Sequence, residues 1–312
     1  MLFLEYLDEV GFPKILMKEI LEDKDKHVYF FRIKGKAHIA PKWDLKILQK
    51  ILKDYLFKYH YTSNISKNAT AYISDKNISF NVKKHQGNSY FFVTDFKNFF
   101  PSISHAYIKK ILYMILKEES DEDIELILNI VTYKDKLQYG FPTSPIISNI
   151  IMKEFDEIIL KKMKDEFHEK DNIQYSRYSD DITISSKYSF EKKKVFDIIK
   201  NLLKNEYSFL LLNHKKTRFF EKYSKNPYIT GLIPLTKRLT IGKKKYNFIK
   251  ANIFVLINKK DIHNENFYDS IKSLSGYLSY VYLVDKHNYF RLKSSFKINY
   301  EDNIEYKQIF KK

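Results

Sequence analysis

The sequence contains no cysteine, and only seven glycines occur among its 312 residues. Without cysteine there is no disulfide framework and no thiolate-ligated zinc or iron–sulfur site, which is consistent with a reducing cytosol. The nine histidines are scattered and none has the H-E-x-x-H spacing, so a zinc hydrolase is not expected. The few glycines include no Walker-type G-x-x-x-x-G-K loop, which argues against that class of nucleotide-binding protein.

Long apolar segments are also missing from the sequence. No uninterrupted apolar run approaches the length that a membrane-spanning helix needs. The first ten residues, MLFLEYLDEV, carry acids from Glu5 onward and no basic leader, so we expect no signal peptide. These features predict a cytoplasmic protein that does not cross a membrane.

What the sequence has in excess is positive charge. The formal net charge is +17 and the isoelectric point is about 9.4, while 44% of the residues are apolar. This balance predicts a globular protein with a polyanionic partner, nucleic acid first and an anionic membrane surface second. A basic but functionally silent surface is the alternative. The length suits one large domain or two to three sub-domains.

The order of predicted elements indicates an α+β fold, with helices packed on an antiparallel sheet. A basic stretch at 236–246 separates a C-terminal segment that is mostly helical. Periodicity and turn residues predict helices over 1–26, 44–59, 105–134, 146–168, 189–206 and 243–310, strands over 27–33, 35–41, 89–96, 209–213 and 228–234, and a hairpin over 173–186.

Carboxylates stand at the ends of two predicted strands. Asp95 closes the strand in YFFVTDFKNFFPSI, and Asp180 and Asp181 are adjacent in RYSDDITIS. If these strands are neighbours, three carboxylates converge, and their repulsion is relieved by hard cations such as Mg²⁺ or Mn²⁺. Two such ions serve phosphoryl transfer in polymerases and in nucleases alike. Alternatively, Asp95 caps a helix and Asp180-Asp181 is only a hairpin turn.

A series of short motifs resembles the reverse transcriptases, specifically those of bacterial retrons. Each motif is weak by itself, but all stand in the order of the family and span roughly residues 27 to 295. The motifs are NVKKH (81–85), VTDFKNFFPSI (93–103), GFPTSPIISN (140–149), YSRYSDD (175–181), LNHKKT (212–217), ITG (229–231) and LSGYLSYV (274–281). Two positions depart from the usual pattern: Ser179 stands where Ala is common, and Tyr139 precedes Gly140 where Gln is common.

The resemblance implies a right-hand polymerase with fingers (1–90), a palm (91–235, with 105–140 partly shared with the fingers) and a helical thumb (236–312). It implies that Asp95, Asp180 and Asp181 hold two Mg²⁺ ions, Asp181 as the more peripheral ligand. Lys216 would lie near the triphosphate and protonate the leaving pyrophosphate. Phe100 would be a steric gate against the ribose 2′-OH, although Phe99 and Phe100 could simply be core.

Further residues follow from the same resemblance. The nucleotide would contact Phe96, a phosphate-clamping Lys36 or Lys34, and the turn formed by Pro142, Thr143 and Ser144, with Ser144 also facing the template. As an alternative for this turn, Ser144 caps a helix whose first residue is Pro145. Asn81 and His85 would contact RNA, with a buried, hydrogen-bonded histidine as the alternative. Lysines that could hold RNA or duplex backbone, or simply cover thumb core, are Lys243, Lys244, Lys245 and Lys250.

The resemblance thus predicts a bacterial RNA-directed DNA polymerase that uses dNTPs. A structured non-coding RNA would serve as template and primer, and the product would be a branched RNA–DNA in anti-phage defence, with a separately encoded effector. The rivals are another defence-associated reverse transcriptase without the branched product and, from a different class, a non-catalytic RNA-binding subunit.

Overall fold

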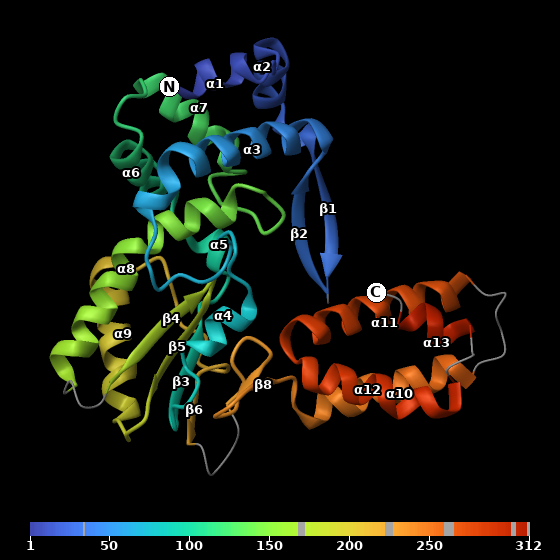
Figure 1. Ribbon diagram of the computed structural model, residues 1–312. Helices are drawn as coiled ribbons and strands as arrows, with labels where there is room; N and C mark the ends of the chain where they lie inside the picture. The colour runs from blue at the N-terminus through green and yellow to red at the C-terminus, as the bar shows by residue number, and fades with distance from the viewer. Residues whose placement is uncertain (34, 168–171, 222–226, 259–264, 301–303, 311–312) are drawn as a thin grey trace.

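The largest sheet of the structure has four antiparallel strands and is seen at the lower left of Figure 1. The computed structural model describes the whole chain except residues 34, 168–171, 222–226, 259–264, 301–303 and 311–312. The strand order is β4-β5-β3-β6, so the two middle strands come from distant parts of the sequence. The strands are β3 (Tyr90–Asp95), β4 (Gln174–Tyr178), β5 (Asp181–Ser186) and β6 (Arg218–Glu221).

The two faces of the sheet belong to two hydrophobic cores. Alternation along β3 puts Phe92 in the larger core and Phe91 in the smaller one. The larger core contains Ile182 and Ile184 of β5 and the apolar faces of α8 (Ser144–Glu166) and α9 (Lys192–Glu206). On the other face lie α4 (Ile78–Lys83) and the short pair β7 (Ile233–Pro234) and β8 (Leu239–Thr240).

The N-terminal elements extend the larger core away from the sheet and carry a separate hairpin. Figure 1 shows β1 and β2 projecting as a two-stranded ribbon beside the helical layer. The strands pair in register from Val28 opposite Pro41 to Ile33 opposite Lys36. The elements are α1 (Phe3–Glu9), α2 (Lys14–Glu22), β1 (Val28–Ile33), β2 (Lys36–Pro41), α3 (Trp43–Leu56), α5 (Phe99–Ser102), α6 (His105–Ile115) and α7 (Asp121–Val131).

Four C-terminal helices form a bundle whose apolar faces build most of the smaller core. The buried Asp285 joins its parts, because it accepts a hydrogen bond from the backbone of Ile241 at 3.0 Å and one from Asn288 at 2.7 Å. Among the described residues no helix is long and apolar enough to span a bilayer. The helices are α10 (Gly242–Asn258), α11 (Glu265–Val284), α12 (Lys286–Tyr300) and α13 (Ile304–Ile309).

The α+β class and most predicted elements are confirmed, with three local corrections. The region 105–134 is two helices, because the chain breaks at 116–120. The predicted strand 209–213 is wrong: only Leu212 makes an isolated bridge, to Phe96, whereas the adjacent RFFE segment forms β6. The predicted strand 228–234 shrinks to Ile233–Pro234.

Candidate active site

Three carboxylates lie at one end of the sheet, where β3 ends, β4 turns into β5 and β5 begins. Asp95 and Asp181 are directly opposite each other in the antiparallel pair β3–β5. Asp180 precedes Asp181 in the turn, and its carbonyl accepts a hydrogen bond from the backbone of Phe96 at 3.2 Å. Like charges opposite each other weaken a sheet, so the arrangement costs stability in the absence of a cation. The predicted convergence of these strands is therefore confirmed.

The hairpin turn that displays Asp180 is tight. Tyr178 pairs with Asp181, which leaves Ser179 and Asp180 as a two-residue loop. Ser179 has a φ of 58°, a left-handed conformation that is unfavourable for a residue with a side chain. Surrounding contacts must therefore hold the turn, and one of them is the hydroxyl of Tyr72, which donates to Ser179 Oγ at 3.3 Å.

Mutual repulsion and burial shift the acids of this site. Burial, followed by the neighbouring charges of Asp180 and Asp95, raises the pKa of Asp181 to about 7. Burial also raises the pKa of Asp180, with a smaller contribution from Asp95. Both shifts oppose ionisation at neutral pH, so the site favours any cation that can enter it.

Lys216 supplies one positive charge to the site. Its ammonium forms an ion pair with Asp95 Oδ2, and the hydrogen bond to this carboxylate raises the pKa of the lysine. The side chain is 64% exposed, whereas that of Asp95 is 3% exposed. Asp95 Oδ1 is buried without a hydrogen-bond partner among the described residues. The lysine therefore neutralises only one oxygen of the buried carboxylate.

The donor set has the chemistry of a Mg²⁺ site but not a closed shell. Carboxylate oxygens are the ligands Mg²⁺ prefers, and the unpartnered Asp95 Oδ1 offers one directly. In the described part of the chain no three acidic or histidine side chains are grouped closely enough to enclose an ion. Mg²⁺ usually keeps several waters and is completed by substrate phosphates, so the residues present fit a site of this open kind.

A pocket of about 230 Å³ opens beside the carboxylates. Its walls come from β3, β5 and β6 and from the segment before β7, so it lies on the side of the sheet that faces the smaller core. Residues that line it include Asp95, Asp181, Lys216, Arg218, Tyr228, Thr230 and Gly231.

The two phenylalanines predicted to contact nucleotide differ in their surroundings. Phe96 is 2% exposed and stacks on Phe99 with ring centroids 5.5 Å apart, so its side chain is core and the predicted nucleotide contact is wrong. Phe100 is 5% exposed, and its ring meets that of Tyr139 at 5.3 Å. The role of Phe100 as a gate stays a prediction.

Tyr139 lies at the site although sequence reasoning assigned it no role. It is 44% exposed, and burial of the hydroxyl, followed by the charges of Asp180 and Asp95, raises its pKa to about 12. Its ring also contacts His38 of β2, with centroids 5.5 Å apart. This residue connects the projecting hairpin with Phe100 and the carboxylates.

The turn before α8 packs directly against the hairpin. A Cβ on Gly140 would lie 2.4 Å from the carbonyl oxygen of Ile39, so only glycine fits this close approach. Thr143 and Ser144 are fully buried, and Pro142 is half-buried. The helix-cap alternative for Ser144 is wrong by one residue: α8 begins at Ser144, whose Oγ accepts a hydrogen bond from the backbone of Gln138 at 3.2 Å.

The remaining predicted residues are either exposed on the surface or buried in the interior. Lys36 is exposed at the start of β2, and Lys34 lies outside the described residues. Asn81 and His85 are 1% and 0% exposed, which contradicts the predicted RNA contact and confirms the alternative of a buried, hydrogen-bonded histidine. His85 joins β4 to β5 through Ser176 and Ser185, with both nitrogen–oxygen distances 2.7 Å. Asn81 accepts hydrogen bonds from Ser176 and Thr70.

We expect burial of His85 to lower the stability of the fold below about pH 6.5, against an opposing contribution from Asp181, whose raised pKa stabilises the metal-free protein as the pH falls. Burial lowers the pKa of His85 from 6.5 to about 3. Between these values the unfolded state binds a proton that the folded state excludes, so the free energy of unfolding falls by about 1.4 kcal/mol per pH unit from this group. Above pH 6.5 the stabilisation is complete. Urea unfolding at pH 7 and pH 5 measures the change. In His85→Gln the stability at pH 5 relative to that at pH 7 should be higher than in the wild type, because the Asp181 contribution is the same in both proteins and the His85 contribution is lost. An equal pH dependence in the two proteins would contradict the assignment.

Comparison with known proteins agrees with this geometry. Residues 23–249 match the family described as reverse transcriptase (RNA-dependent DNA polymerase). The chain belongs to the reverse transcriptase family. The match covers most of the chain, including all four strands of the large sheet and all three carboxylates.

Retron enzymes are among the relatives of this reverse transcriptase. It is 28% identical over 269 residues to the Retron Ec73 reverse transcriptase of Escherichia coli, covering 82% of this chain and 81% of the relative. It is 30% identical over 220 residues to the Retron Ec83 reverse transcriptase of Escherichia coli, covering 67% and 68%. The chain is therefore a retron-type reverse transcriptase.

A solved structure with a similar fold is apo telomerase from Candida tropicalis. The TM-score is 0.50 at 13% sequence identity, over 80% of this chain. The reverse transcriptase described here spans about half, 51%, of that longer chain. At this identity the likeness concerns the fold alone, and it is consistent with the polymerase-like α+β architecture.

The lysines predicted to hold nucleic acid in this reverse transcriptase lie on α10. Lys243, Lys244 and Lys250 are exposed on the helix surface, as phosphate contacts require. Lys245 is half-buried, and its ammonium lies 4.4 Å from the centroid of the Tyr280 ring. Whether these lysines bind RNA or duplex stays a prediction.

Two groups of site residues escaped prediction. Tyr72 and Tyr139 lie in irregular segments, where spacing carries no information about direction. The second is Arg177 of β4, which is fully buried at the base of the hairpin turn; a charged residue in the interior of a predicted strand signals a buried partner.

Proposed function

We propose that this reverse transcriptase adds deoxynucleotides to a 3′-end on an RNA template, with release of pyrophosphate. The single observation that carries the proposal is the cross-strand pair of Asp95 and Asp181 with Asp180 in the adjoining turn. A non-catalytic RNA-binding subunit has no need of this destabilising group of charges, which argues against that rival.

Asp95, Asp180 and Asp181 would hold two Mg²⁺ ions, or Mn²⁺ in their place. When bound, these ions activate the attacking 3′-oxygen and stabilise the leaving pyrophosphate. Asp95 is fixed by β3 and Asp180 by the hairpin, so the chain sets their separation before substrate arrives. Lys216 is protonated while it is paired with Asp95, and once it releases this carboxylate it can donate a proton to the leaving pyrophosphate.

We infer a division into the three parts of a right-hand polymerase. Fingers over 1–90 would include the β1–β2 ribbon with Lys36, a palm over 91–235 the central sheet, and a thumb over 236–312 the C-terminal bundle. Pro142, Thr143 and Ser144 lie at the turn between ribbon and carboxylates; of the three only Pro142 is partly exposed and can contact the template or the incoming base pair, while the buried Thr143 and Ser144 would act by shaping the turn. The ring of Phe100 contacts that of Tyr139, which in turn lies near Asp180 and Asp95.

The finer proposal is that a structured non-coding RNA serves as both template and primer. Priming from an RNA 2′-OH gives a branched RNA–DNA product, in anti-phage defence with a separately encoded effector, in the bacterial cytoplasm. It is supported by the relatives' names and by the net charge of +17, which favours a large polyanionic partner. A defence-associated reverse transcriptase without branched product is the second candidate.

Two measurements test the proposal. Primer extension on an RNA template with Mg²⁺ and dNTPs should yield DNA, and absence of product across templates and salt concentrations would refute it. Sequencing the nucleic acid that copurifies with the protein addresses the finer proposal. A covalent RNA–DNA branch is expected there; unbranched DNA from an active preparation would favour the second candidate.

A further inference from the structure

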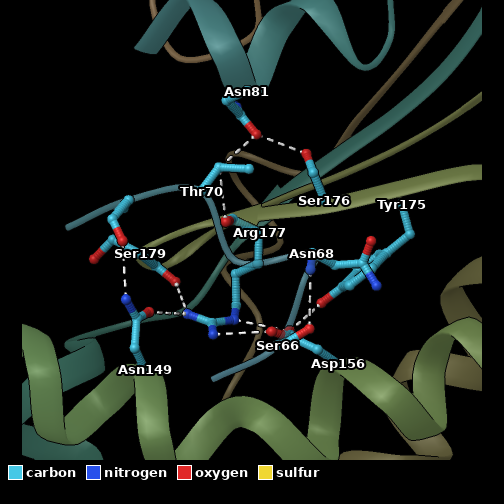
Figure 2. Close-up of polar contacts among 11 residues, drawn as sticks. Ser66, Asn68, Thr70, Asn81, Asn149, Asp156, Tyr175, Ser176, Arg177 and Ser179 are labelled. Atoms are coloured by element: carbon cyan, nitrogen blue, oxygen red, sulfur yellow. Dashed lines mark hydrogen bonds and ion pairs between the residues drawn. The ribbon is translucent and has the colours of Figure 1, made fainter. Parts of the chain in front are cut away.

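A buried ion pair lies directly beneath the hairpin turn that displays Asp180. Arg177 of β4 and Asp156 of α8 are both fully buried, and Arg177 is the largest fully buried side chain in the described structure. They form a two-pronged pair, with Nε to Oδ1 at 2.8 Å and Nη2 to Oδ2 at 2.9 Å (Figure 2). The hydroxyl of Tyr175 also donates to Asp156, at 2.6 Å.

The same guanidinium reaches the turn. Arg177 Nη1 donates to the carbonyl oxygen of Ser179 at 3.1 Å and to Asn149 Oδ1 at 3.2 Å. Asn149 is in turn held by its own amide, which donates to Tyr61 and to the carbonyl of Ala71, both at 2.9 Å. The donor that contacts the turn is thus fixed from two sides by side chains of one rigid helix.

The backbone of Arg177 is held as firmly as its side chain. Its amide donates to the carbonyl of Asn68 at 3.0 Å, and its carbonyl accepts from the amide of Thr70 at 2.9 Å. Segment 66–72 therefore covers the free edge of β4 and ends at Tyr72, which contacts Ser179. Backbone, guanidinium and tyrosine all converge on the residue with the unfavourable φ.

Fold stability alone gives little reason for such a pair. Replacing a buried ion pair by apolar residues of similar volume is often neutral or stabilising. Only a planar fork with several donors can bind Asp156 with two atoms while a third donor reaches the Ser179 carbonyl. Apolar residues could fill the same space, but they could not donate a hydrogen bond to the Ser179 carbonyl and so could not anchor the turn.

We propose that Arg177 is a positioning residue, whose clamp on the Ser179 carbonyl fixes the place of the Asp180 carboxylate. The inference rests on the proposed function, because it concerns the same carboxylates. Arg177 touches neither substrate nor reacting atoms, and acts only through the turn. Its removal should therefore loosen the turn, weaken Mg²⁺ binding and slow primer extension together.

The test removes the clamp while keeping the core filled. The triple variant Arg177→Met, Asp156→Leu, Tyr175→Phe replaces the polar group by apolar side chains of similar size. We expect its Tm to stay within about 4 °C of the wild type. The rate of primer extension should fall about tenfold, below the roughly 100-fold that a 1 Å misplacement can cost. Tyr175→Phe alone is the matched control, since it leaves the contact to Ser179 intact.

Two readouts separate positioning from general stability and from activity. Hydrogen exchange of the Phe96 amide, which bonds to the Asp180 carbonyl, should become about tenfold faster in the triple variant. The Mg²⁺ concentration that gives half of the maximal Tm increase should rise by a similar factor. Both should remain at the wild-type value in Tyr175→Phe. A folded triple variant with unchanged exchange and Mg²⁺ dependence would overturn the proposal.

Two further outcomes are distinct. If the triple variant fails to fold, Arg177→Lys is tested in its place, because it keeps a positive charge opposite Asp156 and loses the planar guanidinium. Faster exchange of the Phe96 amide and weaker Mg²⁺ binding in this variant support the proposal. Unchanged values overturn it. If the wild type extends no primer but the variants show the shifts in exchange and Mg²⁺ binding, the positioning role stands and the proposed polymerase function fails.

Discussion

Replacing Asp180 by Ala should abolish RNA-templated primer extension while leaving the protein folded. The carboxylate is displayed on a two-residue turn, and a metal-based charge stabilisation of about 4 kcal/mol corresponds to roughly a 1,000-fold lower rate. The same change relieves repulsion with Asp95 and Asp181, so the Tm in metal-free buffer should rise or stay equal. Rates with saturating dNTPs, together with thermal melts, measure both effects.

The control for this loss is Asp165→Ala, which removes an exposed carboxylate near the end of α8. It should leave the extension rate at the wild-type value. RNA binding measured by filter retention should be unchanged in both variants, because the net charge rises equally. Extension by Asp180→Ala at more than a tenth of the wild-type rate would remove Asp180 from the catalytic set.

Shortening Phe100 to Val should raise the use of ribonucleotides by about 100-fold relative to deoxynucleotides, if the ring excludes the 2′-OH. Phe100 is 5% exposed and supports Tyr139 at the site, so the change also lowers stability through a partly filled cavity. Competitive incorporation of rNTP and dNTP opposite the same template base gives the selectivity directly.

Phe99→Val is the matched control for the gate. Phe99 is 1% exposed and adjacent in sequence, and its ring packs on Phe96 in the core. Its shortening should cost similar stability without a change in sugar selectivity. Equal selectivity in Phe100→Val and the wild type would mean that Phe100 serves the core only.

The position of the three carboxylates at the ends of strands could be predicted from the sequence, because those strands are easy to recognise. Asp95 follows five uncharged residues, and Asp180-Asp181 interrupts an alternating strand pattern. Predicting that β3 and β5 are neighbours required the order of the family motifs, because no local feature of the sequence indicates which strands pair. The ion pair of Lys216 with Asp95 and the contact of Tyr139 with Phe100 depend on side-chain direction, which residue spacing in loops does not encode.

The failed predictions have physical causes of the same kind. Asn81 and His85 are polar, and polar residues in a family motif suggested RNA, but a buried hydrogen-bond network satisfies them equally well. The apolar run 209–213 looked like a strand and is mostly not one, because its pairing with the end of β3 is limited to a single bridge, Leu212 with Phe96, and the hydrogen bonds on either side of it. The true edge strand β6 carries charges at both ends, Arg218 and Glu221, which masked it.

The smaller core also dictates when this protein can finish folding. Val82 and Phe91 belong to it, yet its other members begin at Ile229 and continue to Phe310. During synthesis one face of the growing sheet stays uncovered until almost the entire chain has left the ribosome. Contacts so distant in sequence form slowly and leave apolar surface open to aggregation in the meantime. Production of soluble protein should therefore depend on an intact C-terminal bundle, and truncations that spare every catalytic carboxylate are still poor starting material.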